Sequence, residues 1–254
     1  MKRLAVLILA SLALTISPAS AERLITSLSS HQVLVSSSFT GTELVLFGAI
    51  ERDGATVPRK GGYDIIVTVT GPRETLVVRR KDRVAGIWTN VESNSFLDAP
   101  LYLAVLSNKP VDDIASAQVL RRLDIGTNVV PRVHVAAGIE SGEELFRDAL
   151  IRLRTQRKLY IDDPAGVTFI TPTLFRATIR LPAESPVGAY DVDVRLFADG
   201  TNIAHATSAL EVVKVGIEQF IVTAARDHGI LYGLFTTLMA LLTGWFASIV
   251  FRRD

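Results

Sequence analysis

The most pronounced hydrophobic pattern in the chain is an uncharged run close to its C-terminus, Gly229–Phe251. Its twenty-three residues are enough to cross a bilayer core of about 30 Å as a helix. Hydrocarbon offers no partner for backbone N–H and C=O groups, so a single apolar segment there must be helical. We therefore predict a transmembrane helix. The alternative, a core helix of a soluble domain, is usually shorter and carries a polar face.

A shorter apolar run, Leu4–Leu14, lies near the start of the chain behind Lys2 and Arg3. It is too short to span a bilayer, and it is followed by Ala19–Ala21, a small-residue pattern typical of a signal-peptidase site. We therefore predict a signal peptide, residues 1–21, that is removed from the mature chain. An uncleaved anchor is the alternative.

The two apolar runs together predict a membrane topology. An exported N-terminus followed by a stop-transfer helix gives a single-pass inner-membrane protein, with residues 22–228 in the periplasm and 252–254 in the cytoplasm. The positive-inside bias of basic residues agrees with this direction. Charged and aromatic side chains next to the run are expected at the membrane interface: Arg226, His228, Tyr232, Trp245, Arg252 and Arg253.

Between the two runs, short segments in which apolar residues alternate with polar ones are separated by turn residues. This spacing is typical of an antiparallel sandwich. The segments predicted as strands are Thr42–Ile50, Tyr63–Thr70, Thr75–Arg80, Gly86–Asn90, Leu101–Ser107, Leu174–Leu181, Tyr190–Phe197 and Ala209–Val215. If Leu174–Leu181 and Tyr190–Phe197 pair, Arg176 and Arg180 would face Asp191 and Asp193 across the sheet.

The middle of the chain has helical periodicity instead. Val111–Leu123 has apolar residues at helical spacing, and Ser141–Glu144 forms a capping box in front of a helix predicted over Gly142–Arg157. We predict a mainly β fold: an immunoglobulin-like antiparallel β-sandwich over residues 22–215 with a helical insertion at about 111–160. A juxtamembrane helix, 216–228, then leads into the span, 229–251. Two small domains divided near residue 135 are the alternative.

Composition excludes several kinds of chemistry. The chain has no cysteine, so disulfides, thiolate metal sites and cysteine nucleophiles are impossible. Basic and acidic residues nearly balance, which gives no reason to expect nucleic acid as a partner. No nucleophile or phosphate-binding motif occurs, and the histidines are scattered along the chain: His31, His134, His205 and His228. We expect no catalytic residues, no metal and no cofactor.

One charge cluster has a possible function of its own. Arg79, Arg80, Lys81 and Arg83 follow one another closely and precede Trp88. The simplest interpretation is the solvated end of a hairpin. The functional interpretation is a contact to an anion, a lipid head group or a protein, with the tryptophan as an aromatic anchor.

Several segments resemble a known family, the uncharacterised alphaproteobacterial putative transmembrane proteins. The resemblance rests on SSHQVLVSSSFTGTELVLFGAI (29–50), VVRRKDRVAGIWTN (77–90), PVGAYDVDVRLF (186–197) and the segment 214–254. It implies a signal peptide, an exported domain and one C-terminal span, and it nominates no catalytic residue. It also suggests genes near sulfite-exporter-like permeases.

Three functions are compatible with these features. The first is a non-enzymatic accessory protein that is held in the bilayer beside an integral membrane partner, such as a sulfur-oxyanion permease. The second is a membrane-tethered module that binds an anion or another ligand through the basic cluster. The third is an enzyme whose residues converge only in the fold, and we rank the three in this order.

Overall fold

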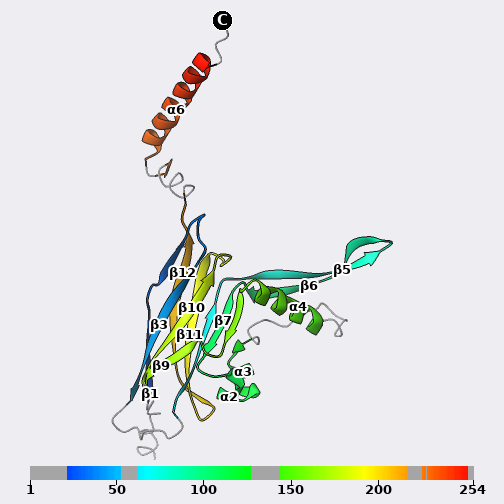
Figure 1. The fold of residues 1–254 in the computed structure, drawn as a ribbon, viewed down its shortest axis with the longest axis vertical. Helices are drawn as coiled ribbons and strands as arrows, with labels where there is room; N and C mark the ends of the chain where they lie inside the picture. Colours follow the sequence, from blue (N-terminus) through cyan, green and yellow to red (C-terminus); the bar gives the residue numbers. More distant parts are fainter. Residues whose placement is uncertain (1–21, 53–61, 127–142, 217–224, 227, 251–254) are drawn as a thin grey trace, which may run out of the picture.

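The computed structural model describes residues 22–52, 62–126, 143–216, 225–226 and 228–250 (Figure 1). The predicted signal peptide, His134, Arg252 and Arg253 lie outside these residues. Two packed β-sheets form the body, a two-stranded arm projects from it, and an isolated helix follows at the C-terminal side (Figure 1). The prediction of a mainly β fold with one C-terminal apolar helix is confirmed.

The first sheet has four strands in the order β1-β3-β10-β9, and all neighbours are antiparallel. Its strands are β1 (Glu22–Leu28), β3 (Gly41–Arg52), β10 (Leu174–Pro182) and β9 (Val167–Thr171). Alternate residues of β3 and β10 point into the body, as the period of two in their sequences predicts. The ring of Phe175 lies against Gly48 of the neighbouring strand, at a site where a Cβ atom would collide with it.

The second sheet has six strands in the order β2-β12-β11-β4-β7-β8. Its strands are β2 (Gln32–Val35), β12 (Thr201–Lys214), β11 (Gly188–Ala198), β4 (Asp64–Thr70), β7 (Leu103–Ser107) and β8 (Tyr160–Asp163). The two edge strands run parallel to their neighbours, β2 to β12 and β8 to β7, and the other pairs are antiparallel. Asp199 and Gly200, both with positive φ, form the predicted turn between β11 and β12.

The main core fills the space between the two sheets. Inward side chains of the first sheet, such as Leu46 and Ile179, meet those of the second, such as Val67 and Val194. All four of these side chains are fully buried. Removal of this apolar surface from water is the main force that holds the sheets together.

A second core covers the outer face of β4 and β7. Three helices lie there, α2 (Val111–Ile114), α3 (Ala117–Arg122) and α4 (Glu143–Gln156). Phe146 and Leu150 of α4 pack in the same cluster as Ile66 and Val105. Because β4 and β7 are buried on both faces, their sequences are almost continuously apolar.

Strands from both sides of residue 135 are mixed in each of the two sheets of the body. The immunoglobulin-like assignment stays a prediction, and two features of the sandwich support it. One is the second strand, β2, which pairs in parallel with the last strand, β12. The other is a hydrogen bond of 2.6 Å from the Tyr190 hydroxyl to the Pro186 carbonyl, as in the tyrosine corner of that fold.

The segments Leu174–Leu181 and Tyr190–Phe197 do not pair, because β10 and β11 belong to different sheets. Arg180 instead forms ion pairs with Glu43 and Asp163, and Asp193 pairs with Arg195 on its own strand at 2.6 Å. Alternation shows which face of a strand is buried, but it does not show which strand lies next to it.

The C-terminal helix α6 (Gly229–Val250) has the length and composition of a membrane span, and none of its apolar window is buried against the body. Figure 1 shows it beyond the end of the sandwich at which β12 ends. The hydroxyls of Thr236, Thr237 and Thr243 donate to carbonyls three or four residues earlier in the helix. These polar groups therefore need no partner from the lipid.

Candidate functional site

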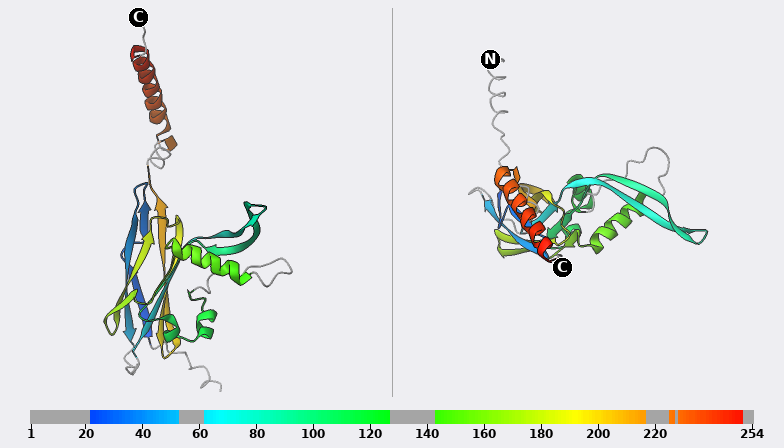
Figure 2. Two further views of the ribbon diagram at one scale, coloured as in Figure 1. Left: turned by 45° about the vertical axis from the view of Figure 1, so that its right-hand side comes forward. Right: turned by 90° about the horizontal axis from the view of Figure 1, so that it is seen from above.

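The basic cluster lies on a long antiparallel arm formed by β5 (Arg73–Val84) and β6 (Ile87–Pro100). The sequence predicted only two short strands here. Figures 1 and 2 show the arm leaving the sandwich beside α4 and extending far to one side of the body. We divide its outer half into a shaft, residues 79–83 and 89–93, and a tip, Val84–Trp88.

The base of the arm is fixed to the body through the second core. Val78 and Phe96 are buried there in the same cluster as Phe146 and Leu150 of α4, and Leu76 packs against that cluster. Beyond this point every residue from 79 to 93 is exposed. The outer half of the arm therefore receives no support from the core and depends on its own ladder of hydrogen bonds.

The sequence-predicted site residues lie together on this outer half, but on both of its faces. Side chains alternate along a strand, so Arg79, Lys81 and Arg83 share one face of the shaft. Arg80 points to the opposite face, where it forms an ion pair of 3.1 Å with Glu92. Among the described residues, neither Arg79 nor Lys81 has an ion-pair partner.

The tip is apolar and turns tightly. Ala85 and Gly86 both have positive φ, 51° and 87°, as a two-residue hairpin turn requires. Val84 and Ile87 pair directly before and after the turn, and Trp88 pairs with Arg83 on the other face. The exposed fractions are 53% for Val84 and 69% for both Ile87 and Trp88, so apolar side chains at the tip face solvent on both sides of the ribbon.

The register of the second sheet shows from which end of the body the arm departs. Thr70, at the end of β4, pairs with Asp191, which pairs in turn with Ala209 of β12. β4 therefore runs in the same direction as β12, the strand from which the chain continues toward α6. Ala209 lies five residues before Lys214, or about 17 Å, so the arm leaves the α6-proximal half of the body.

The predicted interface residues are only partly described. Arg226 and His228 are exposed just before α6, and the His228 carbonyl accepts a hydrogen bond of 2.9 Å from the Tyr232 amide. Within α6, Tyr232 is partly covered, while Trp245 is 65% exposed. This arrangement places aromatic rings toward both ends of the helix, where they favour the membrane interface.

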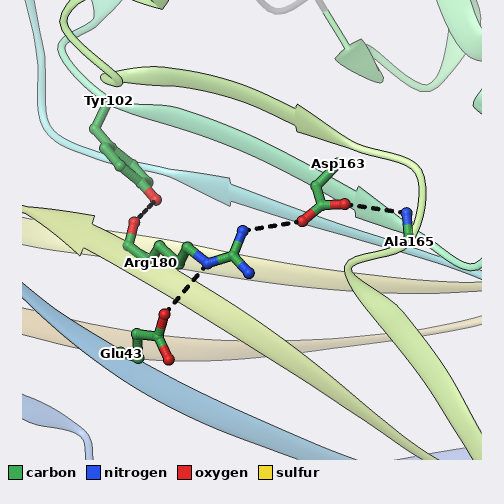
Figure 3. Close-up of polar contacts among 5 residues, drawn as sticks. All are labelled: Glu43, Tyr102, Asp163, Ala165 and Arg180. Atoms are coloured by element: carbon green, nitrogen blue, oxygen red, sulfur yellow. Dashed lines mark hydrogen bonds and ion pairs between the residues drawn. The ribbon is translucent and has the colours of Figure 1, made fainter.

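A cavity of about 830 Å³ that the sequence did not predict lies between the edges of the two sheets. Its walls come from the start of β3, the end of β10, strand β8 and the segment after α4. Arg180 is one of its lining residues. Figure 3 shows Arg180 between Glu43, at 3.3 Å, and Asp163, at 3.2 Å. The Tyr102 hydroxyl donates to the Arg180 carbonyl at 2.7 Å.

This polar network ties one sheet to the other. Tyr102 and Asp163 belong to the second sheet and its connections, whereas Glu43 and Arg180 belong to the first. The guanidinium is already engaged by two carboxylates, so we assign it a structural role at the open side of the sandwich. Partial burial raises the pKa of Asp162 in the cavity wall, and the neighbouring Asp112 and Asp163 raise it further.

Clusters of metal-binding side chains would be a further kind of candidate site in the described part of the chain. No three His, Asp or Glu side chains come together there as a metal site. His205 lies in β12, and His31 lies just before β2. The outer half of the arm stays the candidate site, because all of its residues from 79 to 93 are exposed.

The family comparison covers nearly the whole chain. Residues 23–253 match a family described as "putative transmembrane protein (Alph_Pro_TM)". The chain belongs to this alphaproteobacterial family. No curated protein matches the chain. Membership of this family, together with the apolar helix α6, identifies a membrane protein that contacts the lipid bilayer.

Proposed function

We propose that the protein is a non-enzymatic accessory protein that binds an integral membrane partner through the shaft of its arm. In this proposal α6 crosses the inner membrane, the sandwich stands in the periplasm and the C-terminus is cytoplasmic. The observation that carries the proposal is the arm itself, an exposed ribbon on the α6-proximal half of the body.

The energetics of the arm favour a binding role. A two-stranded ribbon without a packed face is only marginally stable in water. The outer half of this arm buries no apolar side chain, and its ion pair between Arg80 and Glu92 is exposed and therefore weak. Such a segment adds little to the stability of the fold, so a contact outside the molecule is its most direct use.

The spacing of the charges favours a protein surface over a small anion. Arg79, Lys81 and Arg83 are about 7 Å apart along one strand face, since every second residue of a strand points the same way. A small anion needs donors that converge on it, whereas a row of separated cations matches acidic side chains spread over a surface. The alternative function, a tethered anion-binding module, would need a concave site that these residues do not form.

The position of the arm favours a partner within the membrane. A juxtamembrane helix over 216–228, as predicted from the sequence, would add about 20 Å between the sandwich and the bilayer. The base of the arm would then stand within about 40 Å of the lipid, which equals the length of a twelve-residue strand. Sulfite-exporter-like permeases, which the family resemblance suggests, are the first partners to test.

Photo-crosslinking in native membranes tests this proposal. We expect a photoreactive residue at Asn90, the partner of Lys81 across the shaft, to crosslink to one integral membrane protein. The same residue at Ser27, on the outer face of the first sheet, should give no such product. Charge reversal by Arg79→Glu with Lys81→Glu should lower the yield by roughly tenfold, because like charges would then face the acidic partner.

A matched control uses the opposite face of the same shaft. Exchanging the ion pair by Arg80→Glu with Glu92→Arg keeps the net charge and the cross-strand pairing, and it should leave the yield unchanged. The proposal fails if Asn90 gives no discrete product, or if this exchange lowers the yield as much as the double reversal does.

A further inference from the structure

We infer that the tip of the arm inserts into the head-group region of the bilayer that α6 crosses, as a second membrane contact. The site consists of Val84, Ile87 and Trp88 with Arg83 beside them, and its ligand is a lipid surface that contains anionic head groups. The proposed function concerns the shaft and a protein partner, so the two proposals can fail independently.

The distribution of apolar side chains supports insertion of the tip end-on. Val84 and Ile87 lie on one face of the ribbon and Trp88 lies on the other. A ribbon that lies flat on a protein surface would need one apolar face along its length. Here apolar side chains occupy both faces of the extreme end. The shaft behind them carries one exposed apolar side chain, Val91, and its other residues are polar or charged.

The chemistry of the tip suits the membrane interface. Tryptophan favours the head-group level, where its ring meets both apolar and polar surroundings. Arg83 follows directly behind the apolar residues, at the level of Trp88, with which it pairs across the ribbon. Basic side chains at this depth attract anionic head groups. From the end of the arm, apolar side chains thus come first and the aromatic and basic side chains follow together, which matches the order from acyl chains to head groups.

Most backbone polar groups of the tip are already hydrogen-bonded, so the tip can enter the membrane interface at a low cost. Strands β5 and β6 pair as far as Val84 and Ile87, so only the two turn residues, Ala85 and Gly86, lie beyond the ladder. The Gly86 carbonyl accepts a hydrogen bond of 3.1 Å from the Arg83 side chain. Satisfied backbone groups lower the penalty of leaving water.

The arm extends to one side of the sandwich (Figure 1), so its tip meets the bilayer when the body tilts toward the lipid on that side. The arm departs from the α6-proximal half of the sandwich, and Figure 2 shows its outer end bent toward the side on which α6 lies. Neither the described side chains of the body nor those of α4 cover the tip, since Ile87 and Trp88 are each 69% exposed.

Tryptophan fluorescence of the full-length protein tests this inference. The chain has two tryptophans, so Trp245→Phe leaves Trp88 as the only emitter. This variant is placed in nanodiscs of phosphatidylcholine and phosphatidylglycerol, one molecule per disc, with acyl chains brominated near the head group or left plain. We expect brominated lipid to remove about half of the Trp88 emission, as it does for a ring at the interface, and the emission to shift to shorter wavelength.

Two further variants complete the experiment. Moving the probe to the shaft, by Trp88→Phe and Ser93→Trp in the same background, should give a tryptophan that bromine does not quench. Ile87→Asp should abolish the quenching of Trp88 while the circular dichroism spectrum stays the same, because Ile87 supports no core. Nanodiscs contain no partner protein, so a failure of the crosslinking experiment does not affect this result. If Trp88 is quenched no more than the shaft probe, the tip does not enter lipid and the inference is wrong.

Discussion

Alkaline pH is expected to unfold the sandwich steeply above about pH 10, because three tyrosines are protonated and buried in its core. Tyr102, Tyr160 and Tyr190 are between 0% and 5% exposed. Each hydroxyl donates to a backbone carbonyl, at Arg180, Pro100 and Pro186 respectively. Ionisation of any of them would place a charge in the core and remove the proton from that hydrogen bond.

Burial is the main cause of the raised pKa values of these tyrosines. It raises the pKa of Tyr160 to about 12, even though Arg154 and Arg73 act in the opposite direction. It raises the pKa values of Tyr102 and Tyr190 still further. The nearby Tyr190, whose ring centroid is 5.5 Å away, raises the pKa of Tyr102 as well.

The sign of the effect follows from proton binding. An unfolded tyrosine loses its proton near pH 10, while the folded protein retains it, so the stabilisation is complete below pH 10 and declines above it. Each group lowers the free energy of unfolding by about 1.4 kcal/mol per pH unit in this range. Three groups together give a slope of about 4 kcal/mol per pH unit, which would exhaust a typical domain stability of about 5–15 kcal/mol within a few pH units.

A pH titration of the full-length protein in non-ionic detergent measures this slope. Near-ultraviolet circular dichroism should report loss of the fold together with the rise of tyrosinate absorbance. Tyr102→Phe is the informative variant: it should lose about 1–2 kcal/mol at neutral pH, since the Arg180 carbonyl loses its donor, and it should flatten the alkaline slope by about one third. Tyrosinate absorbance that develops fully near pH 10, before the fold is lost, would contradict the account.

Charges in the centre of α6 are expected to release the protein from the membrane. Leu238→Arg with Leu241→Arg replaces two exposed apolar side chains of the span. Each change alters the free energy of insertion by about 3 kcal/mol, so the pair should cost about 6–7 kcal/mol and prevent the helix from stopping transfer. Carbonate extraction should then move the protein from the membrane pellet to the soluble fraction.

The control for this change keeps the helix apolar. Leu238→Ile with Leu241→Ile should remain in the pellet, because isoleucine and leucine insert almost equally well. None of the described side chains of α6 is buried against the body, so the double arginine variant should melt at the same temperature as the parent sandwich. A double arginine variant that stays in the carbonate-washed membrane would show that another part of the chain anchors it.

The sequence predicted several strands with one buried face well, but it did not predict β1, β8 or β9. Thr42–Ile50 and Leu174–Leu181 correspond closely to β3 and β10, because inward and outward residues alternate there. The capping box likewise located α4 within a residue or two. Val111–Leu123, predicted as one helical stretch, is instead broken into α2 and α3, because Ala115 has an extended backbone between them.

The length of the arm and the orientation of its side chains could not be predicted from the sequence. Its outer half is exposed on both faces, so its sequence has no alternation and its two long strands were predicted as short ones. The basic cluster was recognised from composition. That Arg80 points to the opposite face from Arg79 and Lys81 follows only from the alternation of side chains along the observed strand. The cavity around Arg180 joins residues from distant parts of the chain, and no local pattern indicates which strands will become neighbours.

Energy transfer between the protein and membrane lipid tests most directly the central claim, that the arm-bearing end of the sandwich faces the bilayer. The chain lacks cysteine, so Thr89→Cys on the arm or Thr201→Cys at the start of β12 gives a single site for a donor fluorophore. Thr201 lies thirteen residues before Lys214, or about 43 Å farther from the membrane end of that strand. With acceptor lipids in proteoliposomes, we expect several-fold stronger transfer from the arm than from Thr201. Equal transfer from the two sites, or stronger transfer from Thr201, would contradict the account.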